Sequence, residues 1–172
     1  THTVTANLPD AADISVTLLS ASKTFNMPGL GCAYAVVKNT TLRNKLKKVM
    51  NGIVHHVGAL GYTATLAAYK DGKSWHTALV KYLRQNRDHV EANLSAHDRL
   101  TAYHSEATYL TWIDARNMNV DNPSTYFEKF GIGLYDGAPF GAPGFLRLNF
   151  ACPQSVLSEA LKRINKGLEA LT

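Results

Sequence analysis

Residues 14–37 carry the clearest structural pattern in the chain and read Ile14-Ser-Val-Thr-Leu-Leu-Ser-Ala-Ser-Lys-Thr-Phe-Asn-Met-Pro-Gly-Leu-Gly-Cys-Ala-Tyr-Ala-Val-Val37. Residues 14–19 alternate between apolar and polar before becoming wholly apolar, and residues 32–37 form a continuous apolar run, so both ends predict buried β-strands. Between them lie the polar residues 20–26 and a turn with a proline and two glycines. The pattern predicts a strand, a polar functional loop and a second strand.

Outside this stretch, apolar spacing predicts helices in the middle of the chain and a mixed pattern at its end. The middle helices cover residues 41–50, residues 57–69 as a closely packed buried helix, and residues 74–96 with Ser74 as N-cap. The last third has strands over 109–114, 132–135 and 145–150, a short helix over 123–130 and a final helix after Pro153. This ending predicts a compact α+β lobe.

Composition excludes several classes of protein. The 172 residues are 45% hydrophobic, and 18 basic against 13 acidic residues give a net charge of +5. The chain is too hydrophobic to be disordered, and no apolar run approaches the roughly 20 residues that span a bilayer. Cys32 and Cys152 form neither a disulfide framework nor a metal-ligand spacing. No groove-reading motif accompanies the basic residues, so we expect no nucleic-acid partner. Without a spanning run, and without a basic start or apolar signal core in residues 1–4, we expect no membrane partner and a cytoplasmic location.

Lys23 is the first candidate for chemistry. Desolvation between an apolar strand and a glycine–proline turn would make its amine a nucleophile toward a carbonyl group. The alternative is a loop lysine that extends into water, and position alone does not separate the two. Ser20 and Lys23 also match the Ser-x-x-Lys pattern of penicillin-binding proteins. The chain lacks the Ser-Asp-Asn and Lys-Thr-Gly elements of those enzymes, which excludes that class.

Arg147 is the second candidate. Alternation in residues 145–150 places Arg147 and Asn149 on one face of a strand and leucines on the other. An arginine in apolar company needs a partner, because an unmatched buried charge is very costly. The partner is either a carboxylate of the chain, Asp114 or Glu106, or a ligand carboxylate that the guanidinium binds bidentately. The residues alone favour the internal ion pair.

Two further motifs are weaker. His55 and His56 are adjacent and would point in different directions on a helix, so they do not share a metal ion, and we expect no metal site. The glycine-rich residues 137–144 lack the ending of a phosphate-binding loop and precede a strand rather than a helix. They are expected to form a flexible connector beside a site.

Three motifs in order resemble the class I/II aminotransferases, the pyridoxal-phosphate-dependent enzymes of fold type I. They are Ser20-Ala-Ser-Lys-Thr-Phe-Asn-Met-Pro-Gly-Leu30, Glu106-Ala-Thr-Tyr-Leu-Thr-Trp-Ile-Asp114 and Phe145-Leu-Arg-Leu-Asn-Phe-Ala-Cys-Pro-Gln-Ser155. Within that family they look like the branch of cystathionine β-lyases and related carbon–sulfur lyases. The resemblance covers essentially the whole chain. It implies an α/β fold in which residues 1–85 end the large cofactor-binding domain and residues 86–172 form the small α+β domain.

The same resemblance implies roles for individual residues. Lys23 would bond to the aldehyde of pyridoxal 5'-phosphate and then act as general base at the substrate's Cα. Ser20 would bind the cofactor phosphate, with Ser22 as a weaker candidate, and Arg147 would bind the α-carboxylate of an amino-acid substrate. The implied activity is that of a carbon–sulfur β-lyase working as a homodimer. An aminotransferase is the alternative, and a non-catalytic partner-binding module is a further one.

The chain also departs from the family pattern. Many members carry an arginine that grips the phosphate at the position of Gly31, although the lyase branch tends to lack it. Family members are considerably longer, and their first half supplies the partner of the pyridine nitrogen and most of the phosphate site. The resemblance therefore implies that these residues are the C-terminal part of a longer enzyme and are inactive alone.

Overall fold

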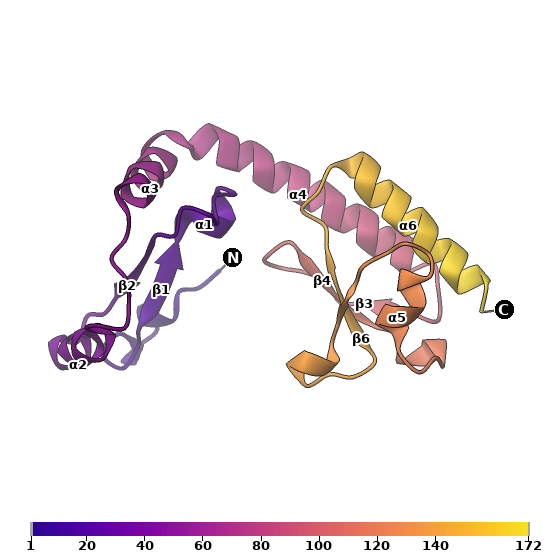
Figure 1. Ribbon diagram of the computed structural model, residues 1–172, viewed down its shortest axis with the longest axis horizontal. Coiled ribbons are helices and arrows are strands. Elements are labelled where there is room, and N and C mark those ends of the chain that lie inside the picture. Colours follow the sequence, from indigo (N-terminus) through magenta and orange to yellow (C-terminus); the bar gives the residue numbers. More distant parts are fainter. Residues whose placement is uncertain (1, 172) are drawn as a thin grey trace. The chain divides into compact units, whose positions relative to one another are not determined.

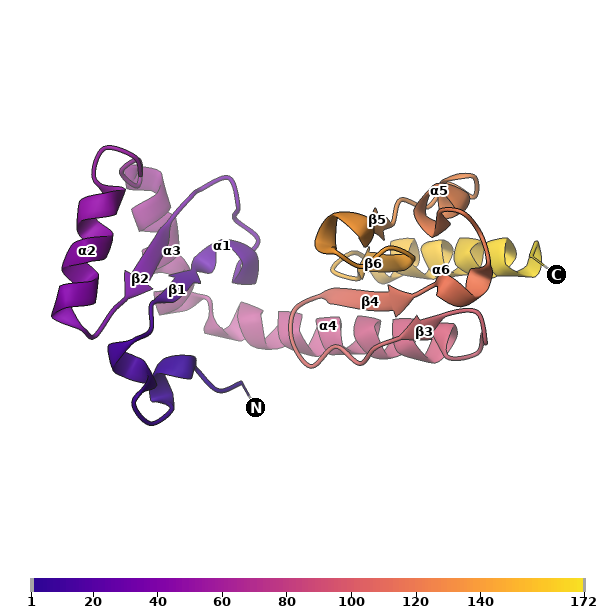
Figure 2. The same cartoon turned by 90° about the horizontal axis from the view of Figure 1, so that it is seen from below.

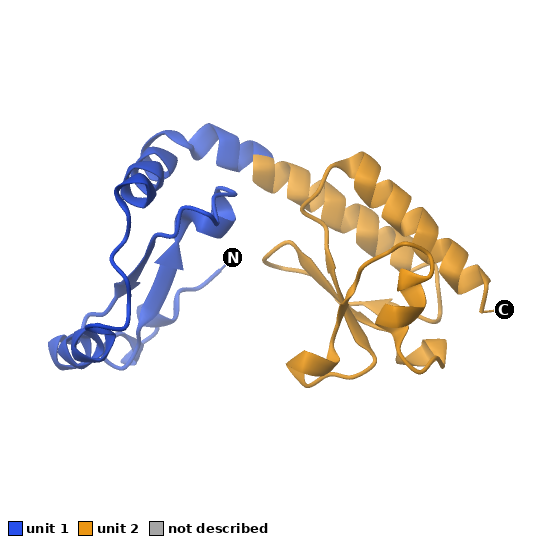
Figure 3. Cartoon of the chain, in the orientation of Figure 1, with its two compact units in different colours: residues 1–78 blue, residues 79–172 orange. Residues whose placement is uncertain are grey.

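The computed structural model describes residues 2–171, and the chain divides into two compact units, residues 1–78 and 79–172 (Figure 3). The division falls within helix α4 (Lys73–Leu94), as does the boundary expected from the sequence. Each unit has a sheet of its own. No helix among the described residues is long and apolar enough to cross a membrane.

The first unit contains a two-stranded antiparallel sheet in which Ser20 lies opposite Ala33. Both predicted strands are present, and the segment between them begins with one helical turn rather than an open loop. In chain order the elements are η1 (Thr5–Asn7), η2 (Ala11–Asp13), β1 (Thr17–Ser20), α1 (Ala21–Thr24), β2 (Ala33–Val36), α2 (Thr40–Met50) and α3 (Ala59–Asp71).

Local hydrogen bonds explain where these helices begin. The Asn39 side chain accepts a hydrogen bond from the backbone N–H of Leu42, 3.1 Å away, and so caps α2. The expectation that Ser74 caps the long helix is wrong. Helix α4 begins one residue earlier, at Lys73, because only Gly72 separates it from the end of α3.

Apolar side chains of the first unit are largely exposed, so the prediction that its strands and the helix over 57–69 are buried is wrong for the described chain. Ile14 is 81% exposed, and Leu18 and Leu60 are each 74% exposed. Within α3 only Gly61 is buried, where the backbone of Gly31 approaches it. A two-stranded sheet and three helices of at most 13 residues offer too little surface to cover the remaining side chains.

The second unit is built on a four-stranded antiparallel sheet in the order β3-β4-β6-β5. The short strand β3 was not predicted from the sequence, because a strand of two residues shows no periodicity. The further elements are β3 (Thr101–Ala102), β4 (Leu110–Asp114), η3 (Arg116–Met118), α5 (Pro123–Glu128), β5 (Tyr135–Asp136), η4 (Ala138–Phe140), β6 (Phe145–Asn149) and α6 (Gln154–Glu169).

One face of this sheet is covered by helices, and α4 and α6 run side by side along it (Figures 1 and 2). The buried cluster joins leucines of β6 to aliphatic side chains of the two helices; it includes Val90, Leu94, Ile113, Leu146, Leu148, Leu161 and Ile164. The predicted alternation in β6 is confirmed, since its leucines are buried and Arg147 lies on the other face. That other face carries the second half of the candidate site.

Asn86 anchors the chain between β6 and α6. It is completely buried on α4, and its Nδ2 donates hydrogen bonds to the carbonyls of Phe150, at 2.9 Å, and Cys152, at 3.0 Å. A buried amide with two acceptors fixes the path of the backbone, because moving it would leave both carbonyls without a donor. Asn86 therefore holds the C-terminal end of β6 against α4.

Candidate functional site

The turn after β1 brings together three of the residues expected in the site. Ser20 caps α1, accepting a hydrogen bond from the backbone N–H of Ser22 at 3.2 Å and donating one to the carbonyl of Cys32 at 2.8 Å. The hydroxyl oxygens of Ser20 and Ser22 lie 2.8 Å apart. Lys23 follows in the same turn, exposed, and its amine makes no hydrogen bond or ion pair with any residue from 2 to 171.

Phe25 fixes this turn to the corner between α3 and α4. Its ring centroid lies 5.9 Å from those of Tyr69, Trp75 and His76, edge-on to the first and stacked on the second. Gly72 lies at this corner, where a Cβ would come within 2.6 Å of the Phe25 ring. Trp75, in the first turn of α4, therefore packs on the lysine turn. The sequence reasoning missed this cluster because aromatic residues at such separations show no pattern.

Arg147 lies at the centre of β6, opposite Trp112 on β4 and Tyr135 on β5. Its guanidinium carbon is 4.4 Å from the centroid of the Tyr135 ring and 5.0 Å from that of Phe140. Within the described chain the side chain of Arg147 makes no hydrogen bond and no ion pair, and its Nε is buried without a partner. Two aromatic rings thus provide its surroundings.

The internal ion pair that the residues favoured for Arg147 is wrong. Asp114 pairs with Arg116, whose Nη2 lies 2.7 Å from Oδ2, and this hydrogen bond lowers the pKa of Asp114. Glu106, the other carboxylate considered, is exposed and has no bond to Arg147. Because Asp114 pairs with Arg116, the guanidinium of Arg147 has no carboxylate partner among the described residues.

Aromatic side chains line the Arg147 face of the sheet. Trp112 stacks on Phe145 at 5.7 Å and meets Phe140 edge-on at 6.0 Å. Sequence reasoning missed Tyr135 and Phe140, because only the pairing of β5 with β6 and the path of the following loop place them beside Arg147. The one sequence signal that pointed to this region was the glycine-rich segment before β6, which contains Phe140.

That glycine-rich segment is closed rather than flexible as expected. The N–H of Gly137 donates to the carbonyl of Phe145 at 2.8 Å, and the N–H of Ala142 donates to the carbonyl of Gly137 at 3.1 Å. A Cβ on Gly137 would lie 2.3 Å from the Ala142 carbonyl oxygen, so glycine is required there by close approach of the backbone. The closed loop holds Phe140 in place over Arg147.

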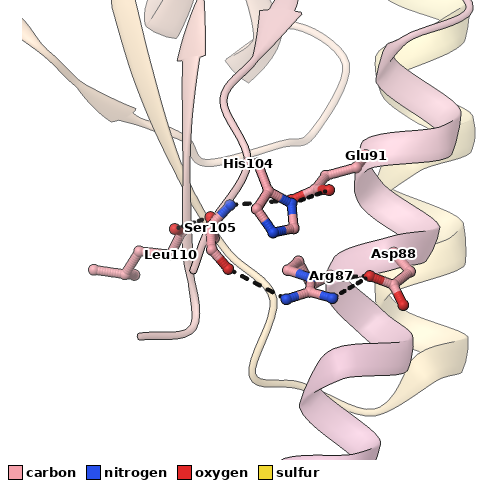
Figure 4. A network of polar contacts seen from close by, with 6 residues as sticks. All are labelled: Arg87, Asp88, Glu91, His104, Ser105 and Leu110. Carbon is pink, nitrogen blue, oxygen red and sulfur yellow. Dashed lines mark hydrogen bonds and ion pairs between the residues drawn. The ribbon is translucent and has the colours of Figure 1, made fainter. Parts of the chain in front are cut away.

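A polar network ties the loop before β4 to helix α4 (Figure 4). Both carboxylate oxygens of Glu91 are used, one by the backbone N–H of Ser105 at 3.1 Å and the other by the His104 ring at 2.9 Å. Arg87 reaches the Ser105 carbonyl at 3.4 Å. The loop also contains Thr108 with a φ of 68°, a left-handed conformation that is strained for a β-branched residue. This network orders the segment that carries the Glu106 motif.

The two halves of the candidate site belong to different units. Ser20, Ser22 and Lys23 lie together in the first unit, and Arg147 lies with its aromatic neighbours in the second. The geometry of each half is defined within its own unit. Residues 2–171 contain no group of three histidine, cysteine or acidic side chains that could hold a metal ion.

Comparison with known proteins places this arrangement in a family. The family model described as aminotransferase class I and II matches residues 3–164. Cystathionine β-lyase PatB of Bacillus subtilis (strain 168) is 32% identical over 97% of this chain and 45% of its own length. The structure of OvoB matches with a TM-score of 0.90 and 42% identity, over 92% of this chain and 42% of that one.

A further solved structure adds a bound cofactor. Cystalysin from Treponema denticola, which contains pyridoxal 5'-phosphate, matches with a TM-score of 0.90 and 32% identity over 99% of this chain and 45% of its own. The chain spans less than half the length of each of these proteins. The family resemblance and the α/β fold class expected from the three motifs are confirmed. The chain therefore belongs to the class I and II aminotransferase family, on its carbon–sulfur lyase branch.

Proposed function

We propose that the whole protein containing this chain is a pyridoxal-phosphate-dependent carbon–sulfur lyase of the cystathionine β-lyase type, acting on an amino acid. The observation that carries the proposal is Lys23. Its amine is exposed and without a partner, on a turn that Ser20, Ser22 and Phe25 hold in place. Relatives named cystathionine β-lyase match nearly the whole of this chain, which supports the same assignment.

The residues of the turn fit the cofactor. A covalent bond to an aldehyde requires an accessible amine, which Lys23 provides. Two hydroxyls, those of Ser20 and Ser22, lie beside it and could donate hydrogen bonds to a phosphate. The Ser20 hydroxyl donates to the Cys32 carbonyl, so it would have to turn away from that carbonyl to serve the phosphate. Gly31 adds no positive charge, so the remaining phosphate contacts would come from other parts of the whole protein.

The two halves of the site would have different roles, one binding the substrate and the other transferring a proton. Arg147 would hold the α-carboxylate through its unused N–H donors and so orient the amino acid. Lys23 Nζ would take the proton from Cα, and a thiolate would then leave from Cβ. Pyridoxal phosphate, when bound, withdraws the electrons that the lost proton leaves at Cα.

An aminotransferase is the second candidate. Its support is that the matching family model is that of the aminotransferases, and that LL-diaminopimelate aminotransferase of Nitratidesulfovibrio vulgaris (strain DP4) is 28% identical over 93% of this chain. Both reactions use the same lysine and arginine and begin with the same proton transfer. They differ in whether the group on Cβ leaves or the amino group is passed to a 2-oxo acid.

The exposed apolar surface of the first unit supports a homodimer in the whole protein. Leu18 and Leu60 are each 74% exposed and Leu66 is 67% exposed. Burying such surface contributes about 25 cal/mol per Å² of apolar area, which favours covering it with further chain and a second copy. Light scattering during gel filtration of the whole protein should give twice the mass of one chain, and a monomer would contradict the dimer.

The test uses the whole protein with pyridoxal phosphate and L-cystathionine. A lyase releases a thiol, a 2-oxo acid and ammonia together without any acceptor, whereas an aminotransferase releases no thiol and depends on an added 2-oxo acid. Borohydride reduction followed by peptide mass mapping should find the cofactor on Lys23, and Lys23→Ala should abolish both the label and thiol release. Cofactor on a different lysine, or no reaction with either assay, would overturn the assignment.

A further inference from the structure

We infer that Tyr135 and Phe140 are positioning residues, which hold Arg147 so that its N–H donors face the substrate carboxylate. The inference rests on the proposed function, because that function makes Arg147 the carboxylate-binding group. It goes further by assigning a role to two residues that no motif marks. Both rings lie over the guanidinium carbon, at 4.4 Å for Tyr135 and 5.0 Å for Phe140.

Each ring is held by a different part of the second unit. Tyr135 lies directly across from Arg147 in the pairing of β5 with β6. Phe140 is carried by the closed turn η4 and meets Trp112 edge-on, and Trp112 in turn stacks on Phe145. Tyr135 and Phe140 together form what we call the aromatic clamp. One of its rings comes from a neighbouring strand and the other from a loop, and backbone hydrogen bonds fix both segments.

The chemistry of the clamp explains why it suits a ligand-binding arginine. Aromatic ring faces stabilise a cation without accepting its N–H groups in conventional hydrogen bonds, whereas a carboxylate partner uses those donors. Arg116 provides the contrast, since it lies over Phe145 at 4.9 Å but also donates two side-chain hydrogen bonds to Asp114. Arg147 has its rings and no such carboxylate among the described residues.

The clamp also points to the kind of ligand. The guanidinium is a planar fork, and two rings over it leave its edge as the approach for a partner. A planar carboxylate matches this edge with two parallel hydrogen bonds. The rings are themselves exposed, Tyr135 by 64% and Phe140 by 56%, so a carboxylate bound at this edge would also contact ring surface that is open to solvent in this chain.

The first test measures steady-state kinetics of the whole protein with L-cystathionine. Tyr135→Leu and Phe140→Leu should each raise KM about two- to fivefold, the loss expected for one exposed cation–π contact, with kcat within about twofold of wild type. Tyr135→Phe and Phe140→Tyr keep the ring and should restore the wild-type KM. Tyr103→Leu removes another exposed tyrosine of the same unit and should change neither constant.

A double-mutant cycle makes the test specific for Arg147. In an Arg147→Ala background, Tyr135→Leu should have no further effect on KM, because its effect acts through the arginine. Equal KM values for wild type and both leucine variants would overturn the inference. So would effects that persist unchanged in the Arg147→Ala background, since these would show a structural or direct role of the rings.

The second measurement does not depend on activity. In nitrogen-15 NMR spectra of the whole protein, the signal of the Nε–H of Arg147 should be displaced by the ring currents of its neighbours, and either leucine variant should reduce that displacement. An Nε–H signal that neither variant moves would refute the clamp. A whole protein with no lyase or aminotransferase activity would instead refute the proposed function, and the NMR result would still decide on the clamp.

Discussion

Replacing Arg147 with alanine should leave the fold nearly as stable as before. The change removes two contacts with aromatic rings, each worth about 0.5–1 kcal/mol at an exposed site. It also removes a buried Nε that has no partner, which relieves a penalty of about 1–3 kcal/mol. These contributions nearly cancel, so the free energy of unfolding should change by no more than about 1 kcal/mol.

The same substitution should be severe for the reaction. A bidentate contact with the substrate carboxylate comprises two hydrogen bonds between charged groups, worth about 1.5–3 kcal/mol each. Losing both corresponds to a fall in kcat/KM of about a hundredfold to ten-thousandfold. Arg147→Lys keeps the charge but lacks the planar fork, so it should recover only part of this loss.

Two assays separate these effects. Urea denaturation of the 172-residue chain, followed by tryptophan fluorescence, gives the stability change, and kcat/KM of the whole protein with L-cystathionine gives the loss of activity. Arg163→Ala is the matched control, because Arg163 pairs with Glu159 on the outer surface of α6 and should affect neither activity nor stability strongly. A stability loss above about 3 kcal/mol would refute the reasoning, since it would mark Arg147 as part of a buried structural ion pair.

Asn86→Leu should lower the free energy of unfolding by about 2–4 kcal/mol, because two backbone carbonyls lose their donor, and an unchanged urea midpoint would contradict this role. Thr108→Gly should raise stability by about 1 kcal/mol by removing the strain of a φ of 68°, and a lower urea midpoint would show that the threonine is not strained. The hydrogen bond with Tyr34 and burial raise the pKa of Tyr69 to about 12. This raised pKa stabilises the fold fully below pH 10, the ordinary pKa, and the stabilisation is lost as the pH rises toward about 12. In an ultraviolet absorbance titration of this chain, Tyr34→Phe should therefore bring ionisation of Tyr69 to lower pH, and an unshifted curve would contradict the pairing.

Predictions from the sequence succeeded where structure follows from near neighbours along the chain. The alternation of apolar and polar residues in β6 correctly placed its leucines and Arg147 on opposite faces. The turn signals correctly located the segment around Lys23. The predictions failed where the contacts of a residue depend on how other parts of the chain fold around it. The ion pair expected between Arg147 and either Asp114 or Glu106 does not form, because Asp114 pairs with Arg116, two residues along, and Glu106 is exposed. The strands predicted to be buried are exposed, because burial depends on what packs over them.

Most of the local elements, the family and the two principal candidate residues, Lys23 and Arg147, could be predicted from the amino-acid sequence. Periodicity and motifs are properties of neighbouring residues, so one chain read in order is enough to find them. The surroundings of those residues became visible only in the fold: Phe25 against the α3–α4 corner, and Tyr135 and Phe140 over the guanidinium. These contacts depend on strand register and on loop paths that bring distant residues together, and no local pattern encodes either.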